Sequence, residues 1–124
     1  MTPRREGNII PFMKILVVDD ESDICYILGF ELKSLGHQVT TVDNVAEAME
    51  HLQKENYDAI LCDFQMPRLN GLDLLNWMKV QKKEIPFYIL TGEPTMETHH
   101  LIERGVRDIL FKPQDLLRLS KIFK

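Results

Sequence analysis

The sequence has little cysteine, no long apolar run and no dense block of basic residues. Its two cysteines, Cys25 and Cys62, show neither CxxC nor Cys/His spacing, which argues against a zinc or redox site and favours buried, reduced thiols. No segment approaches the roughly 18 apolar residues of a membrane helix, and Lys14 interrupts any signal-peptide core. The mild net charge of −4 argues against a nucleic-acid or anionic-membrane surface. These absences favour a globular protein of the cytoplasm.

The chain contains short β-branched runs that alternate with amphipathic stretches. A length of 124 residues suits one domain, and regular strand–helix alternation predicts an α/β fold with a parallel sheet covered on both faces. Residues 1–13 precede the first strand and are expected to form a flexible N-terminal arm, which leaves 14–124 as the domain. The strands are expected at Lys14–Val18, Gln38–Val42, Tyr57–Cys62, Phe87–Leu90 and Asp108–Phe111. The helices are expected after the N-cap Ser22, over Val45–Lys54, Gly71–Val80 and Thr95–Arg104, and from Pro113 onward.

Polar side chains follow the ends of four of these strands. Asp19 and Asp20 follow the first strand, Asp63 the third, Thr91 the fourth and Lys112 the fifth. Ligands of open parallel sheets bind at the carboxyl ends of the strands, so these side chains are expected to converge. Each also has a plainer interpretation: the acidic pair as a helix-capping turn, Thr91 as an ordinary turn residue and Lys112 as a surface charge.

The charge balance of this cluster predicts a divalent cation. Two carboxylates about 4 Å apart repel each other by about 4 kcal/mol at an effective dielectric constant near 20, and Lys112 offsets only one charge. Mg²⁺ suits a few carboxylates with water or phosphate oxygens in its other positions. A carboxylate such as Asp63 can attack phosphorus to give an aspartyl phosphate, while Lys112 and Thr91 stabilise the phosphoryl oxygens.

Four motifs, each at the end of an expected strand, carry a family resemblance. They are Asp19-Asp20, the stretch from Asp63 to Gly71 with Met66-Pro67 inside it (D-x-x-M-P-x-x-x-G), Leu90-Thr91-Gly92, and Lys112-Pro113. In this order the chain, from residue 14 onward, resembles the receiver domain of bacterial two-component response regulators, the CheY-like superfamily. The resemblance implies a flavodoxin-like (βα)5 sheet of order 2-1-3-4-5.

The resemblance also implies a phosphorelay role. Asp63 would take a phosphoryl group from a sensor histidine kinase or a histidine phosphotransfer protein, and no separate enzymatic activity is expected beyond Mg²⁺-dependent self-phosphorylation and slow autodephosphorylation. The metal ligands implied are Asp20 directly, Asp19 through water, Asp63, and the backbone carbonyl of Gln65.

Further residues acquire roles from the resemblance alone. The side chains of Gln65 and Glu93 would tune hydrolysis of the aspartyl phosphate, and the Lys112-Pro113 bond would be cis. Output is expected through a protein–protein contact on the face formed by the fourth helix, the fifth strand and the fifth helix. The sequence does not decide whether a homodimer forms there, nor does it name the kinase.

One position departs from the family pattern. Ile109 stands where the family often has Tyr or Phe, so the usual aromatic switch would be muted or rebuilt.

Two alternative functions would require other residues. A phosphorylation-independent pseudo-receiver would usually lose an acidic residue or the lysine, and this chain keeps them. A phosphatase of the haloacid-dehalogenase type would need D-x-D after the first strand, which the chain lacks.

Overall fold

The computed structural model describes residues 12–93 and 96–123 and contains a five-stranded parallel sheet of order β2-β1-β3-β4-β5. This confirms the predicted fold class and strand order. The strands are β1 (Lys14–Val18), β2 (Gln38–Val42), β3 (Ala59–Asp63), β4 (Phe87–Thr91) and β5 (Asp108–Phe111).

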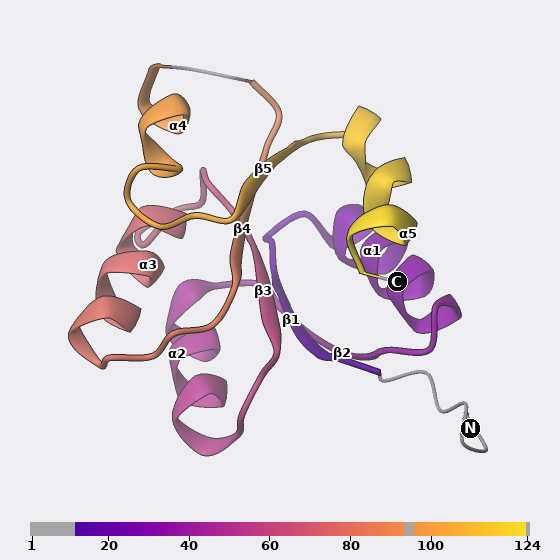
Figure 1. The fold of residues 1–124 in the computed structure, drawn as a ribbon, viewed down its shortest axis with the longest axis horizontal. Coiled ribbons are helices and arrows are strands. Elements are labelled where there is room, and N and C mark those ends of the chain that lie inside the picture. Colours follow the sequence, from indigo (N-terminus) through magenta and orange to yellow (C-terminus); the bar gives the residue numbers. More distant parts are fainter. Residues whose placement is uncertain (1–11, 94–95, 124) are drawn as a thin grey trace.

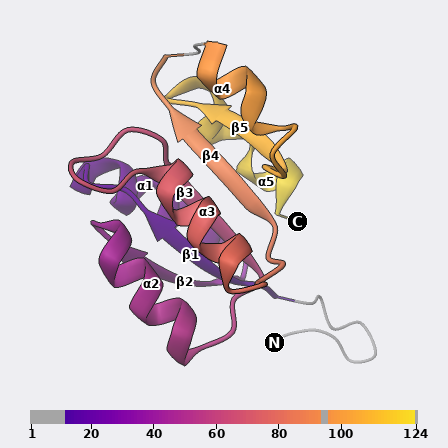
Figure 2. The same cartoon turned by 90° about the vertical axis from the view of Figure 1, so that its left-hand side faces the viewer.

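Helices cover the sheet on both sides. The helices are α1 (Ser22–Ser34), α2 (Val45–Lys54), α3 (Gly71–Val80), α4 (Met96–Leu101), the 3₁₀ helix Gln114–Arg118 and α5 (Leu119–Ile122). Figure 1 shows α2, α3 and α4 on one side of the sheet and α1 and α5 on the other. Figure 2, turned by a quarter, shows α2 and α3 lying across the sheet in front of β1 and β3.

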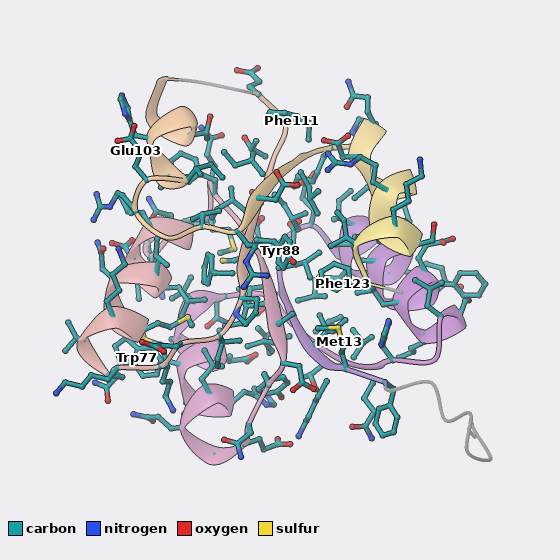
Figure 3. The ribbon with its side chains drawn as sticks, viewed as in Figure 1. Met13, Trp77, Tyr88, Glu103, Phe111 and Phe123 are labelled. Carbon is teal, nitrogen blue, oxygen red and sulfur yellow. The ribbon has the colours of Figure 1, made fainter. Side chains whose placement is uncertain are left out.

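The strands are apolar on both faces because each face contributes to a separate core. Leu16 and Val18 pack with α2 and α3, whereas Ile15 and Val17 pack with α1 and α5. All four side chains are fully buried. The side chains in Figure 3 fill the space on both sides of the sheet, with Tyr88 and Phe123 on the α1–α5 side. A sheet buried in this way leaves its polar residues at the strand ends.

Local details differ from the predictions at element boundaries. Ser22 is the first helical residue of α1 rather than its N-cap, which is Glu21 and forms no side-chain cap bond. β3 begins at Ala59, later than predicted, and it includes Asp63, while β4 includes Thr91.

The last predicted helix differs from the prediction in its helix type. Pro113 precedes a 3₁₀ helix over Gln114–Arg118 instead of starting an α-helix, and only four residues, Leu119–Ile122, are α-helical. The predicted helix Thr95–Arg104 ends earlier than expected, at Leu101, and Thr95 itself lies outside the described residues.

His37 joins the two ends of the domain. Its ring nitrogen Nδ1 accepts a hydrogen bond from the backbone N–H of Met13 at 2.9 Å, so Nε2 carries the proton and donates to the carbonyl of Phe123. The side chain is buried. Residues 1–11 of the expected N-terminal arm lie outside the described residues, so the boundary at residue 13 stays a prediction.

Candidate functional site

Lys112 brings the carboxyl ends of β1, β3 and β5 together. Its Nζ lies 3.1 Å from Oδ2 of Asp19, 3.4 Å from Oδ2 of Asp63 and 2.5 Å from Oε1 of Glu21. The Lys112 side chain is only 9% exposed. Burial alone would lower the pKa of its ammonium, but the bond to Glu21 and the charges of Asp19 and Asp63 outweigh burial and raise that pKa. Lys112 is therefore charged across the physiological range.

Asp63 ends the central strand β3 and is 5% exposed. Its Oδ1 accepts a hydrogen bond from the backbone N–H of Gln65 at 3.2 Å. Burial raises the pKa of its carboxyl to about 6, and the charge of Asp19 adds to this rise, while Lys112 opposes it. The carboxylate form therefore dominates only above about pH 6 without a bound cation.

Asp19 and Asp20 complete an acidic cluster with Asp63. One oxygen from each of these carboxylates lies within 4.8 Å of the other two, and Asp19 is fully buried while Asp20 is exposed. Burial raises the pKa of Asp19 as well, although the backbone N–H of Glu21 and the charge of Lys112 oppose this rise. Three oxygen ligands at this spacing, one of them open to solvent, suit a hard divalent cation such as Mg²⁺. The residues therefore fit the predicted metal.

The loop after β3 is fixed by local bonds and by one close approach. Asn70 and Asp73 exchange side-chain and backbone hydrogen bonds in a capping box that begins α3. A Cβ added to Gly71 would lie 2.9 Å from the carbonyl oxygen of Asp63 and 2.9 Å from a methyl of Ile89, so only glycine fits there. The Gly of the sequence motif thus holds the start of α3 against the backbone of Asp63.

Thr91 stands at the end of the neighbouring strand, but its hydroxyl is engaged locally. Oγ1 donates to the carbonyl of Glu93 at 2.9 Å and accepts from its N–H at 3.2 Å, and the residue is 3% exposed. Among the hydrogen bonds of the described residues, none joins the Thr91 hydroxyl to Asp63. The side chains of Gln65 and Glu93 are both exposed, as residues that meet solvent at a site would be. The Lys112-Pro113 bond is cis, as predicted.

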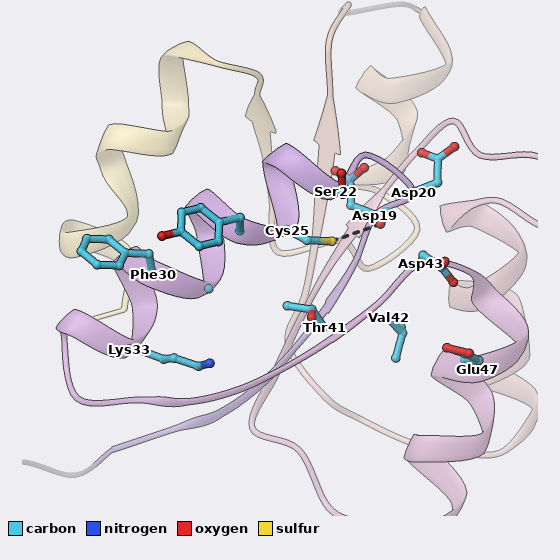
Figure 4. A pocket seen from close by; sticks show the side chains of 12 residues that line it. Asp19, Asp20, Ser22, Cys25, Phe30, Lys33, Thr41, Val42, Asp43 and Glu47 are labelled. Carbon is cyan, nitrogen blue, oxygen red and sulfur yellow. Dashed lines mark hydrogen bonds between the residues drawn. The ribbon is translucent and has the colours of Figure 1, made fainter.

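A groove extends from the acidic edge along α1 and β2. Figure 4 shows Asp19, Asp20 and Asp43 at one end of it and Phe30 and Lys33 at the other. Its volume is about 680 Å³. The thiol of Cys25 donates to the carbonyl of Asp19 at 3.1 Å, and burial raises the pKa of that thiol to about 11.

Glu21 is the site residue that the sequence reasoning missed. Its carboxylate makes the shortest of the three contacts to Lys112, and its backbone N–H donates to Oδ1 of Asp19 at 2.9 Å. The sequence held one signal, a third acidic residue directly after the pair Asp19-Asp20. An acid at the start of a helix is usually explained by the helix dipole, so the sequence alone offered no reason to expect its contact with Lys112 after β5.

Comparison with known proteins now decides the family. A family model described as the response regulator receiver domain matches residues 15–124. The chain belongs to this family. The receiver domain is the module of two-component response regulators that accepts a phosphoryl group and signals, and the acidic edge described above is where this chain carries the corresponding motifs.

Curated relatives of this receiver domain are larger proteins. The transcriptional regulatory protein ZraR of Klebsiella oxytoca is 33% identical over 107 residues, which are 86% of this chain and 24% of that protein. The response regulator protein PilR of Pseudomonas aeruginosa is 34% identical over 110 residues, 88% of this chain and 25% of that protein. The chain thus spans about a quarter of the length of these relatives.

Solved structures agree with the fold. The receiver domain of NtrX from Brucella abortus has a TM-score of 0.80 and 32% identity, covering 87% of this chain and 92% of that one.

Among the described residues, no helix has the length and apolarity that a bilayer crossing requires.

Proposed function

We propose that Asp63 is the phosphoacceptor of this receiver domain and that a sensor histidine kinase or a histidine phosphotransfer protein is the donor. The observation that carries the proposal is the position of Asp63: at the end of the central strand, 3.4 Å from the buried Lys112 and within the three-carboxylate cluster. Of the clustered acids it alone ends β3, where the loops after β1 and β5 reach it from both sides.

The proposed transfer is an in-line displacement. An Oδ atom of Asp63 forms a bond to phosphorus while the phosphorus–nitrogen bond of the phosphohistidine breaks, and the imidazole leaves with that electron pair and takes a proton. Lys112 leaves its present carboxylate contacts in part and donates to a phosphoryl oxygen. Thr91 would donate to another oxygen after its hydroxyl rotates away from the carbonyl of Glu93.

Mg²⁺ is the cofactor that we propose for this site. Asp19, Asp20, Asp63 and the backbone carbonyl of Gln65 would hold it, with Asp19 acting through water. When bound, Mg²⁺ would neutralise the cluster and the charge that develops on the phosphoryl oxygens. Support comes from the raised pKa values of Asp19 and Asp63, because a bound cation would stabilise the ionised form of both carboxylates.

We also propose how the domain signals. The phosphorylated form would contact a downstream protein through the face formed by α4, β5 and α5, in which Arg118 bonds Asp108 at 3.0 Å. No turnover of an external substrate is proposed beyond self-phosphorylation and slow autodephosphorylation. The free thiols of Cys25 and Cys62 support a role in a reducing compartment, the cytoplasm.

Mass measurement after incubation with Mg²⁺ and acetyl phosphate tests the assignment. We expect the wild type to gain one phosphoryl group and Asp63→Asn to gain none. Asp23→Asn, which removes an exposed carboxylate from α1, is the matched control and should be modified like the wild type.

Three other results would contradict the proposal. A wild type that stays unmodified with donor and kinase alike would indicate a phosphorylation-independent module. Modification that persists in Asp63→Asn would place the acceptor elsewhere. Steady hydrolysis of an external phosphoester would indicate an enzyme.

A further inference from the structure

A second groove lies at the opposite end of the sheet from Asp63. It has a volume of about 510 Å³ and is formed by the end of α3, the segment that leads into β4 and the turn before β5. Lys79, Lys83 and Arg107 line it, and Glu84 is the only acid among the lining residues. The chain as a whole carries a net charge of −4, whereas the charged residues that line this groove are mainly positive.

The three cations have no partners of opposite charge within residues 12–93 and 96–123. Every ion pair described there uses Lys14, His51, Lys112 or Arg118 as its cation. Lys79 and Lys83 lie near the end of α3, where the helix dipole favours positive charge, and this effect alone could account for them. It does not account for Arg107, which comes from a different element.

Arg107 is placed beside the lysines by the backbone. Its N–H donates to the carbonyl of Phe87 at 2.7 Å, which ties the turn before β5 to the first residue of β4. Lys83 is held as well, because its N–H donates to the carbonyl of Met78 at 2.9 Å. Lys82, directly before Lys83, adopts a φ of +57°, a left-handed conformation that is most common for glycine. The cations therefore project from fixed backbone rather than from loose loops.

The floor of the groove is apolar. Leu75, Met78 and Phe87 line it and belong to the core on the α2–α3 side, with exposures of 4%, 2% and 1%. Ile85 and Pro86, which are half-buried, form part of the wall. A cavity of this size with an apolar floor and a few charged groups at the rim is typical of a binding site.

We propose that this groove binds an acidic segment of a partner protein, with one apolar side chain packed against the half-buried Ile85 and Pro86 and carboxylates paired with Lys79, Lys83 and Arg107. Charge complementarity selects the acidic character of the partner, and the apolar wall selects a protein segment over a bare polyanion. Because the groove and Asp63 lie at opposite ends of the sheet, the segment would dock without covering the phosphoacceptor and independently of Mg²⁺.

Nuclear magnetic resonance titration of the ¹⁵N-labelled protein with a short acidic peptide that contains one central leucine tests this proposal. We expect shifts confined to the amides of residues 78–85, 87 and 105–107, equal with and without Mg²⁺ and unchanged in Asp63→Asn. A peptide with serine in place of the leucine should bind several-fold more weakly, since it lacks the apolar anchor.

Charge reversal supplies the matched comparison. Lys83→Glu/Arg107→Glu should weaken binding of the leucine peptide about tenfold or more, whereas Lys54→Glu/Lys121→Glu, with the same net charge change at exposed sites elsewhere, should leave it within about twofold. Circular dichroism confirms that both variants fold.

Four results would overturn the proposal. They are the absence of binding, shifts outside the groove, equal loss in the two double variants, and tighter binding of duplex DNA or inorganic polyphosphate than of the leucine peptide. The proposed phosphoacceptor role would stand in each case, because its test does not involve this groove.

Discussion

The acidic edge and the α4–β5–α5 face are built in opposite ways. At the acidic edge, Lys112 joins Asp19 and Asp63, residues 93 and 49 positions away along the chain, inside a buried cluster. On the α4–β5–α5 face the helices have six and four residues, and Arg118 pairs with neighbours three and ten positions away at 44% exposure.

This difference suits the proposed division between phosphoryl transfer at the acidic edge and signalling on the other face. Phosphoryl transfer needs atoms held in place, and long-range pairs between strand ends provide that. The proposed signalling face has to rearrange at low cost, and the ion pairs of Arg118 there are exposed and cost little to break. Mutations at the acidic edge should therefore have large effects on phosphorylation, and mutations on the other face should have small ones.

The largest effect is expected from Lys112→Ala. Loss of the ammonium leaves Asp19 and Asp63 buried without a cation and removes a donor to the phosphoryl oxygen. Phosphorylation by acetyl phosphate should slow about 100-fold, and without Mg²⁺ the free energy of unfolding should fall by about 3 kcal/mol. Mass measurement and urea unfolding report the two effects. Lys121→Ala, an exposed control in α5, should change neither. Equal phosphorylation rates in Lys112→Ala and the wild type would contradict the assignment of the acidic edge as the phosphorylation site.

A pH effect on stability is expected next in size. The folded protein raises the pKa of Asp63 from 3.8 to about 6, so the folded state binds this proton more tightly than the unfolded chain. Stability should therefore rise by about 1 kcal/mol as the pH falls from about 7.5 to about 5, and the raised pKa of Asp19 acts in the same direction.

Urea unfolding without Mg²⁺ at several pH values measures this rise. Asp63→Asn should flatten the profile, and Mg²⁺ should reverse its sign, because the cation stabilises the ionised carboxylates. A profile that is identical in wild type and Asp63→Asn would contradict the origin of the effect.

A smaller effect is expected from Glu21→Gln. The change releases Lys112 from its shortest contact and removes a negative charge that repels the donor, so phosphorylation should become about two- to fivefold faster. Stability should change little, because the Glu21 side chain is 59% exposed. The rate of mass gain measures this, with Glu31→Gln, an exposed residue of α1, as control. A slower Glu21→Gln would mean that Glu21 positions Lys112 instead of withholding it.

The smallest effect on phosphorylation is expected from Ile109→Ala. Ile109 is half-buried on β5 and packs against the core on the α2–α3 side, so the free energy of unfolding should fall by about 1 kcal/mol. The rate of mass gain should stay within about twofold of the wild type. A rate loss approaching that of Lys112→Ala would break the division between the two regions.

Much of this arrangement was predictable from the sequence because burial dictates pattern. The apolar runs at Lys14–Val18 and Asp108–Phe111 predicted their strands, and the polar residues that end the strands predicted the acidic edge. The strand order followed from resemblance. The structure brings Asp19, Asp20, Asp63 and Lys112 together as expected.

What the sequence did not reveal depends on side-chain direction and on the ends of helices. The hydroxyl of Thr91 is bound to Glu93, a rotamer that no sequence pattern specifies. Glu21 reaches Lys112 across 91 positions, and such a contact follows only from the fold. The 3₁₀ turn of Gln114–Arg118 was missed because spacing of three or four residues suits both helix types.

The bridge through His37 has a consequence for how the domain can be joined to others. One buried imidazole holds Met13 and Phe123, so the described part of the chain begins and ends at one corner of the fold (Figure 3). That corner lies where β1 and β2 begin, a full strand length from Asp63. Sequence joined before Met13 or after Phe123 would therefore meet the described fold on the side away from the acidic edge.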